Sequence, residues 1–269
     1  MAVMDFIRSQ EIELKKPINQ VDWEKIYNLA LETDDFRFVS DIGSLTNFFL
    51  SCNIHPEVYL EELPEFFLAF TDITNFTIPS NIHKIGARAF YNCENLSSIV
   101  IPTTVTDIAD RAFLKSGING INLPPGIKEI GSFTFSLCPN LKYITIPQSV
   151  KVIGANAFRG SGLQEVILED GIEIIGESAF QDCLSLHNIT LSNTLQRINN
   201  RAFYNCDKLK EIVIPRSVTH FGIHIFNDSV QVIHYRGSEE DWNNIHKSMY
   251  WGANLSSFVT TIDYDYKGI

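Results

Sequence analysis

The chain of 269 residues lacks an excess of basic residues, long apolar runs and abundant cysteine. Its 21 Lys and Arg stand against 32 Asp and Glu, and this acidic balance excludes a general nucleic-acid binder, which needs a basic surface. No run of about 18 apolar residues is present, so the sequence offers no transmembrane helix. Five cysteines are too few for a disulfide framework. The composition, 45% hydrophobic and 20% charged, is typical of a folded globular chain.

Motifs that bring catalytic or metal-binding groups together are also missing. The chain has no His-Glu-x-x-His, no Gly-x-Ser-x-Gly, no phosphate-binding glycine loop and no Cys-x-x-Cys. His220 and His224 lie four residues apart, but Phe221 and Gly222 between them indicate a corner and not a helix. We therefore expect no enzyme, no cofactor and no metal. The alternative is an enzyme with its site in residues 1–64, where carboxylates and His55 form no recognisable constellation.

The first residues do not resemble a secretory signal. Asp5, Arg8, Gln10 and Glu11 interrupt any apolar run of the length that a signal needs. We therefore expect a cytoplasmic protein, or a surface or secreted one if a signal has been removed. Residues 1–72 hold 5 Lys and Arg against 14 Asp and Glu, which concentrates the negative charge at this end.

A repeat with a period of roughly 23 residues runs through the middle of the chain. Its marker is a phenylalanine, usually after alanine, which recurs at two interval lengths that differ by a single position. The members are Phe90, Phe113, Phe135, Phe158, Phe180, Phe203 and Phe226. Phe67 precedes Phe90 by the longer of the two intervals, which predicts a degenerate repeat starting near Leu63 and Pro64. Self-similarity at a nearly constant period predicts a solenoid of stacked coils.

One repeat, residues 96–113, shows how a coil is built. Ile99 and Ile101 alternate with outward residues, which is the two-residue period of a strand. Pro102 ends the strand because proline donates no ladder hydrogen bond. A glycine at the offset of Gly86 recurs in most repeats, and we expect a tight left-handed turn there. Stacking such coils makes a parallel sheet and aligns the phenylalanines in a buried ladder.

Four of the cysteines share one offset of the repeat, three residues after the phenylalanine. We expect them to form a buried ladder of small apolar groups. Cys183 and Cys206 fall on neighbouring coils, so a disulfide between them is an open alternative. Cys93 and Cys138 are two coils apart, roughly 10 Å, which is too far for a disulfide.

The string Leu-x-x-Ile-x-Ile-Pro-x-x-Val-x-x-Ile-Gly-x-x-Ala-Phe-x-x-Cys-x-x-Leu resembles the BspA-type leucine-rich repeat family over roughly residues 65–235. The resemblance implies a leucine-rich repeat solenoid with its parallel β-sheet on a concave face. It also implies binding to other proteins, often on cell surfaces or extracellular matrix. Residues 235–245 are similar to the closing segment of clostridial and gut-bacterial proteins of this kind.

The two ends differ from the repeat, and a solenoid needs caps over its terminal coils. We divide the chain into a helical, acidic N-terminal cap or domain (1–64), a solenoid of about seven to eight repeats (65–235) and a C-terminal cap of a helix plus a strand (236–269).

Apolar spacing supports both caps. Residues 21–33 show the spacing of a helix, and 41–51 and 58–70 do so less cleanly. At the other end, residues 238–241 fit a capping box. We expect Trp242, Ile245 and Met249 to share one helical face against the last coil, and a final strand over 258–264.

The strand residues that alternate with the inward ones are candidates for binding a partner. We predict a contact surface on the concave face made of Ser98, Val100, Asn122, Tyr143, Thr145, Glu165, Ile167, Asn188, Thr190, Glu211 and Val213. Tyr143, with Ile167 beside it, is the predicted anchor. The acidic N-terminal region is the alternative surface.

Together these features predict a non-catalytic protein–protein interaction module, an intracellular adaptor or inhibitor. The alternative is a bacterial surface or host-matrix adhesin of the BspA type. The predicted partner is another protein, with no nucleic acid and no membrane insertion.

Overall fold

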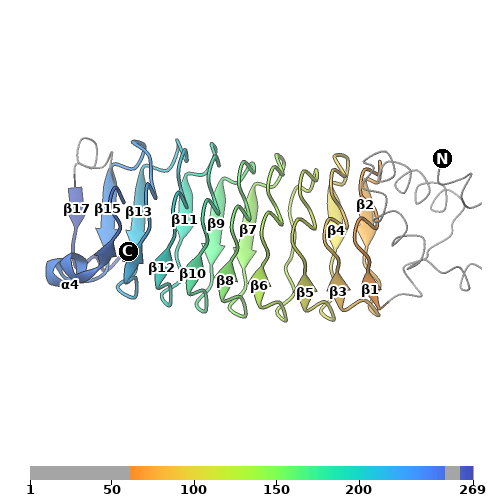
Figure 1. The fold of residues 1–269 in the computed structure, drawn as a ribbon, viewed down its shortest axis with the longest axis horizontal. Coiled ribbons are helices and arrows are strands. Elements are labelled where there is room, and N and C mark those ends of the chain that lie inside the picture. Colours follow the sequence, from red (N-terminus) through yellow and green to blue (C-terminus); the bar gives the residue numbers. More distant parts are fainter. Residues whose placement is uncertain (1–60, 252–260, 269) are drawn as a thin grey trace, which may run out of the picture.

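The computed structural model describes residues 61–251 and 261–268, which form a parallel β-solenoid of about eight turns (Figure 1). Most turns have one short strand and one longer strand, on opposite sides of the body. The predicted solenoid is confirmed because the strands of successive coils, wherever they pair, pair in parallel.

The short strands form one ladder along the body. In chain order they are β1 (Glu62–Leu63), β3 (Lys84–Ile85), β5 (Asp107–Ile108), β6 (Glu129–Ile130), β8 (Val152–Ile153), β10 (Ile174–Ile175), β12 (Arg197–Ile198), β14 (His220–Phe221) and β16 (His246–Lys247). Hydrogen bonding divides this ladder between β5 and β6. We call its outward side chains the short-strand face.

The longer strands form the second ladder. They are β2 (Asn75–Thr77), β4 (Ser98–Val100), β7 (Tyr143–Ile146), β9 (Glu165–Leu168), β11 (Asn188–Thr190), β13 (Glu211–Ile214), β15 (Val232–Tyr235) and β17 (Thr261–Asp263). Hydrogen bonding joins them in three groups, β2 with β4, β7 to β11, and β13 to β17. We call the outward side chains of this ladder, and of residues 120–122 between β4 and β7, the long-strand face.

Alternation of inward and outward residues explains why these short segments become strands. In β7 and β9 the burial alternates residue by residue, and Ile144 pairs in register with Val166. Stacking the inward residues of every coil produces one continuous apolar core. No single coil can bury this face by itself, so stability comes from neighbouring coils.

The phenylalanine ladder is confirmed. From Phe90 to Phe226, successive rings stack with centroids 5.0–5.8 Å apart and planes within 13° of parallel. All of these rings are buried. The constant spacing of one ring per coil follows from the parallel register of the strands around them.

The predicted first repeat exists, but its register differs by one residue from the prediction. Leu63 pairs with Ile85, which places Leu68 at the ladder position and Phe67 at the position of Ala89. Phe67 instead meets Phe76 edge-on, with ring centroids 6.3 Å apart. The backbone register outweighs the aromatic match because each shifted residue would lose its ladder hydrogen bonds.

The repeated glycine does not adopt the left-handed conformation that we predicted. Positive φ angles occur two residues later, at Arg88 (56°) and Ser178 (55°) for example. The glycine is needed for space: a Cβ on Gly86 would lie 2.5 Å from the Leu63 carbonyl oxygen, and one on Gly176 would lie 2.6 Å from that of Ile153. At this position of the repeat the backbones of adjacent coils are therefore in contact, and glycine leaves room for them.

The cysteine column is a hydrogen-bonded column and not a purely apolar one. Each thiol donates to a carbonyl of the preceding coil, as Cys138 does to Phe113 at 3.1 Å. Buried serine or threonine fills the same offset where cysteine is absent, and Ser116 Oγ lies 3.4 Å from Cys138 Sγ. Cys183 and Cys206 are free thiols, so the open disulfide alternative is not adopted. Burial raises the pKa of the Cys138 thiol to about 11 and that of Cys183 to about 12.

The predicted helical cap over residues 1–64 lies outside the described residues, except for its last four. Those four contain β1, so the parallel ladder begins inside the segment predicted to be helical. Residues 61–70 form a strand and a turn, which corrects the helix predicted over 58–70. The apolar spacing of a coil imitates that of a helix here, because inward residues recur at short intervals around the corner.

The C-terminal cap begins with α4 (Glu239–Asn244), which has the predicted capping box between Ser238 and Asp241. Trp242 and Ile245 are buried as predicted, whereas Met249 is 74% exposed. The helix ends before β16, so Met249 cannot share its face. The predicted last strand is present as β17, and residues 258–260 lie outside the described part. Among the described residues, no helix has the length and apolar character to cross a membrane.

Candidate interaction surface

The structure brings the eleven predicted contact residues onto the long-strand face. One outward column contains Ser98, Tyr143, Glu165, Asn188 and Glu211, and the next contains Val100, Asn122, Thr145, Ile167, Thr190 and Val213. All are exposed except Val213, which is half-buried. Their spacing along each column is one coil, about 4.8 Å where strands pair.

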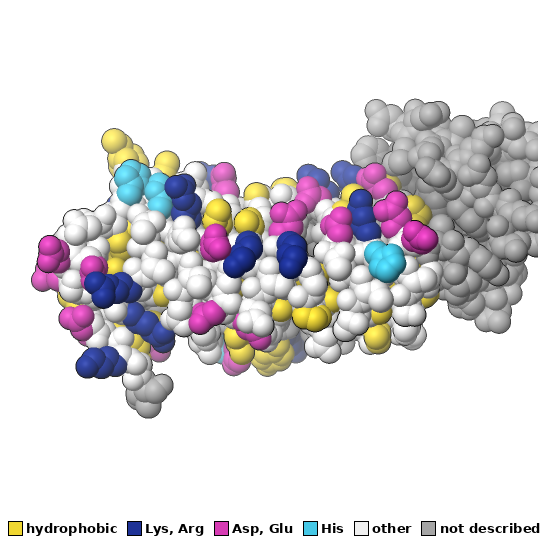
Figure 2. Space-filling view, turned by 90° about the horizontal axis from the view of Figure 1, so that it is seen from below, with side chains coloured by type: hydrophobic (Ala, Val, Ile, Leu, Met, Phe, Trp, Pro, Cys, Tyr) yellow, Lys and Arg dark blue, Asp and Glu magenta, His cyan; other side chains and the backbone are white. Residues whose placement is uncertain are grey.

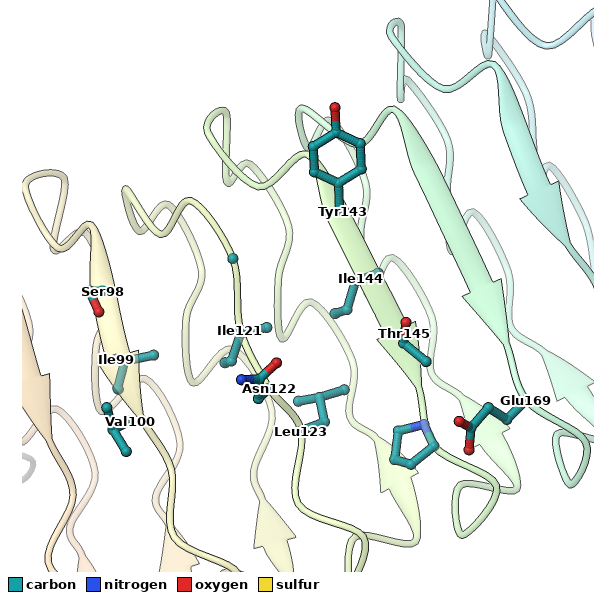
Figure 3. Close-up of a pocket in the computed structure, with 12 residues that line it drawn as sticks. Ser98, Ile99, Val100, Ile121, Asn122, Leu123, Tyr143, Ile144, Thr145 and Glu169 are labelled. Atoms are coloured by element: carbon teal, nitrogen blue, oxygen red, sulfur yellow. The ribbon is translucent and has the colours of Figure 1, made fainter.

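A shallow hollow of about 670 Å³ lies on this face between β4 and β7 (Figure 3). Residues of four successive coils line it, and in the described chain residues 120–122 make no strand pairing with either neighbour. Gly120 stands where the other coils carry an outward side chain, and a Cβ there would meet nothing within 4 Å. The missing side chain therefore opens the hollow.

Neutral side chains line most of the hollow. Val100 and Tyr143 are both 55% exposed and project on either side of Asn122. Ile121 shows only 9% of its surface and belongs to the core beneath. Glu169 is the single ionisable residue with a carboxylate among those that line the hollow. The hollow therefore combines an apolar wall with amide and hydroxyl groups.

Charge enters the face only beyond β7. Glu165 lies 3.6 Å from His187, and Glu211 lies 3.6 Å from His234. His234 Nδ1 also lies 3.1 Å from a carboxylate oxygen of Asp263 on β17. The long-strand face therefore has a neutral part, from β2 to β7, and a part with acidic and histidine side chains, from β9 to β17.

The predicted anchor pair is diagonal. Tyr143 pairs in register with Glu165, while Ile167 pairs with Thr145, so Tyr143 and Ile167 lie in different columns of adjacent coils. The Tyr143 hydroxyl donates to Gln164 Oε1 at 3.1 Å, which holds the ring at the edge of the hollow. Diagonal neighbours on a sheet lie within reach of one large side chain of a partner.

The hollow itself was not predicted from the sequence. A glycine at an outward strand position weakens a strand, and Gly120 is followed by the double proline Pro124–Pro125. These two features together were the available signal. Elsewhere, within residues 61–251 and 261–268, no group of three or more His, Cys, Asp and Glu side chains is arranged to hold a metal ion.

Comparisons with known proteins agree with this architecture. A family model described as the BspA type leucine-rich repeat region matches residues 61–186 and 151–265, with six copies. A leucine-rich repeat protein from Bacteroides ovatus is similar in structure, with 25% identity, a TM-score of 0.53, and coverage of 72% of this chain and 64% of the other. A leucine-rich repeat protein from Eubacterium ventriosum shares 30% identity, with a TM-score of 0.49 and coverage of 58% and 42%.

The chain thus spans less than two thirds of the length of either bacterial protein. A search of curated proteins found no match.

Proposed function

Because this chain belongs to the BspA-type leucine-rich repeat family, we propose that it is a non-catalytic module that binds another protein through its long-strand face. The observation that supports this most is the exposure of Val100, Tyr143 and Ile167 at 50–55% on one side of a rigid body. Tyrosine is one of the residue types that supply most of the binding energy where they become buried in an interface, and the exposed apolar side chains beside Tyr143 gain from burial. The hollow beside Gly120 gives the partner a recess to fill.

The electrostatics of the face favour a protein partner over a nucleic acid. No Lys or Arg occupies either outward column from β2 to β17 in the described chain. A phosphate backbone needs several cations along its path. We infer that the partner presents an uncharged segment to the β2–β7 part, with polar or basic groups towards Glu165 and Glu211.

Site-specific crosslinking tests this proposal directly. A photoreactive amino acid replaces Tyr143 in one variant and Leu184 in a matched control, because Leu184 is 57% exposed but lies outside the long-strand face. After expression in the native host, we expect a discrete crosslinked protein with the probe at 143 and none at 184. Equal crosslinking from both positions, or only from the control, would contradict the proposal.

The affinity for the crosslinked partner then measures how much Tyr143 contributes to binding. Tyr143→Ala should weaken binding by about thirtyfold, the loss typical of a buried aromatic contact. Leu184→Ala should leave affinity unchanged. Both variants should keep the wild-type unfolding midpoint, since neither side chain belongs to the core.

We propose that the module acts inside the cell as an adaptor or inhibitor, and the alternative is a surface or host-matrix adhesin. Cell fractionation combined with protease treatment of intact cells separates the two. Protease-resistant protein in the cytosolic fraction supports the adaptor. Protein that the protease removes from intact cells contradicts it and favours the adhesin.

A further inference from the structure

Two histidines meet at the C-terminal end of the short-strand face. His220 on β14 pairs in parallel register with His246 on β16, so both side chains point outward from adjacent coils. Their rings are nearly parallel, with centroids 4.7 Å apart, and the two Nδ1 atoms are 2.9 Å apart. The sequence spacing had drawn attention to His220 and His224, but His224 stacks on Tyr250 instead.

The distance between the two nitrogens is that of two adjacent ligands on one metal ion. With metal–nitrogen bonds of about 2.0–2.1 Å, a 2.9 Å edge corresponds to a nitrogen–metal–nitrogen angle of roughly 90°. Imidazole suits Ni²⁺, Cu²⁺ and Zn²⁺, whereas Ca²⁺ and Mg²⁺ prefer oxygen. We propose that His220 and His246 chelate one divalent transition-metal ion, with water completing its coordination.

The contact between the two rings is compatible with this role. In the absence of metal, one ring donates its Nδ1 proton to Nδ1 of the other ring. When a metal binds, that proton moves to Nε2 of its own ring through solvent, and both Nδ1 lone pairs become ligands without net proton release. Burial lowers the pKa of His220, and the nearby His246 and Arg197 lower it further.

The neighbouring charge sets the strength of the site. Arg197 on β12 pairs with His220 from the other side and opposes a second cation. Lys247 donates a hydrogen bond to the Trp242 carbonyl, and this contact keeps its ammonium group away from the two histidines. With two protein ligands and one opposing cation, the site is a weak one that responds to the available metal concentration. Because β16 is the last strand of its ladder among the described residues, a bound metal would also link its coil to β14.

Calorimetric titration with Ni²⁺ tests the proposal on the full chain, without a histidine tag, at pH 7.5. We expect one ion per chain. His220→Ala and His246→Ala should each weaken Ni²⁺ at least about tenfold, since each removes half of the chelate. His224→Ala is the matched control, because this histidine lies at the same end and outside the pair. Lowering the pH to 5.5 should weaken binding, because protons compete with the metal for imidazole nitrogens.

Thermal unfolding provides a second readout that is independent of binding heats. Saturating Ni²⁺ should raise the unfolding midpoint of the wild type and of His224→Ala, but not of the two pair variants. Melting the variants without metal shows whether they are folded. Failure to bind Ni²⁺ at millimolar concentration, or an equal loss in His224→Ala, would overturn the site.

Discussion

The two faces of the solenoid share one core but expose different kinds of side chain to solvent. On the short-strand face, Lys84 lies 3.8 Å from Glu62 and 3.9 Å from Asp107. Figure 2, seen from below the view of Figure 1, shows Lys and Arg interleaved with Asp and Glu along the body. On the long-strand face the outward columns are mostly neutral, and Val100 and Tyr143 are 55% exposed.

This difference indicates which face is available to a partner. Charges of both signs that pair along a ladder satisfy one another and keep their water, so burying them under a partner costs desolvation. Neutral and apolar side chains carry no such cost and gain from burial. Both faces are built from the same repeated backbone, so only the outward residue types distinguish the charged face from the proposed interaction surface.

The largest expected effect comes from the core that both faces share. Phe180→Ala removes one ring of the stack and should destabilise the chain by about 3–5 kcal/mol, because the coils around it cannot collapse into the space. Urea unfolding measures this, with Leu184→Ala as the exposed control. A loss below about 1 kcal/mol would show that the ring stack does not hold the faces together.

Alanine substitutions at two glycines compare a close backbone contact between coils with the open hollow of the long-strand face. Gly176→Ala places a Cβ against the backbone of the preceding coil and should cost about 1–3 kcal/mol. Gly120→Ala meets nothing and should change the free energy of unfolding by less than about 0.5 kcal/mol. Gly120→Trp should fill the hollow and lower the affinity for the partner, while the protein remains folded. Equal stability losses in the two alanine variants would refute this assignment.

Alkaline pH should destabilise the chain through the thiol column at the corner of the coils. The pKa of Cys138 is raised by burial from 9.0 to about 11, so the unfolded chain releases this proton first. The contribution is fully present below pH 9 and is lost as the pH rises towards 11, by on the order of 1 kcal/mol at pH 10. Unfolding of Cys138→Ser, which copies Ser116, should show a smaller drop between pH 7.5 and pH 10. An unchanged drop would mean that other groups cause it.

The smallest effect should come from the charged ladder. Lys84→Ala should change the free energy of unfolding by less than about 1 kcal/mol, because its ion pairs are exposed and screened. It should leave partner affinity unchanged, in contrast to Tyr143→Ala. A loss of affinity that disappears in high salt would move the binding surface to the short-strand face.

Much of this organisation was predictable from the sequence. The regular period of the repeat predicted the phenylalanine ladder, the strands and the outward residues between the buried ones, because a repeat transfers one local pattern to every coil. The capping box of α4 was equally local. Phe67 and Gly86 were interpreted wrongly because their roles depend on the coil beside them, through register in one case and close backbone contact in the other.

By itself, the sequence determined the repeat, the inward and outward faces and the family, since each depends on residue type and on spacing within a single repeat. Only the tertiary structure decided that the sheet opens at Gly120, that the thiols bind carbonyls of the preceding coil and that His220 meets His246. Each of these features depends on residues of different coils, and the distance between such residues is set by how one coil stacks on the next.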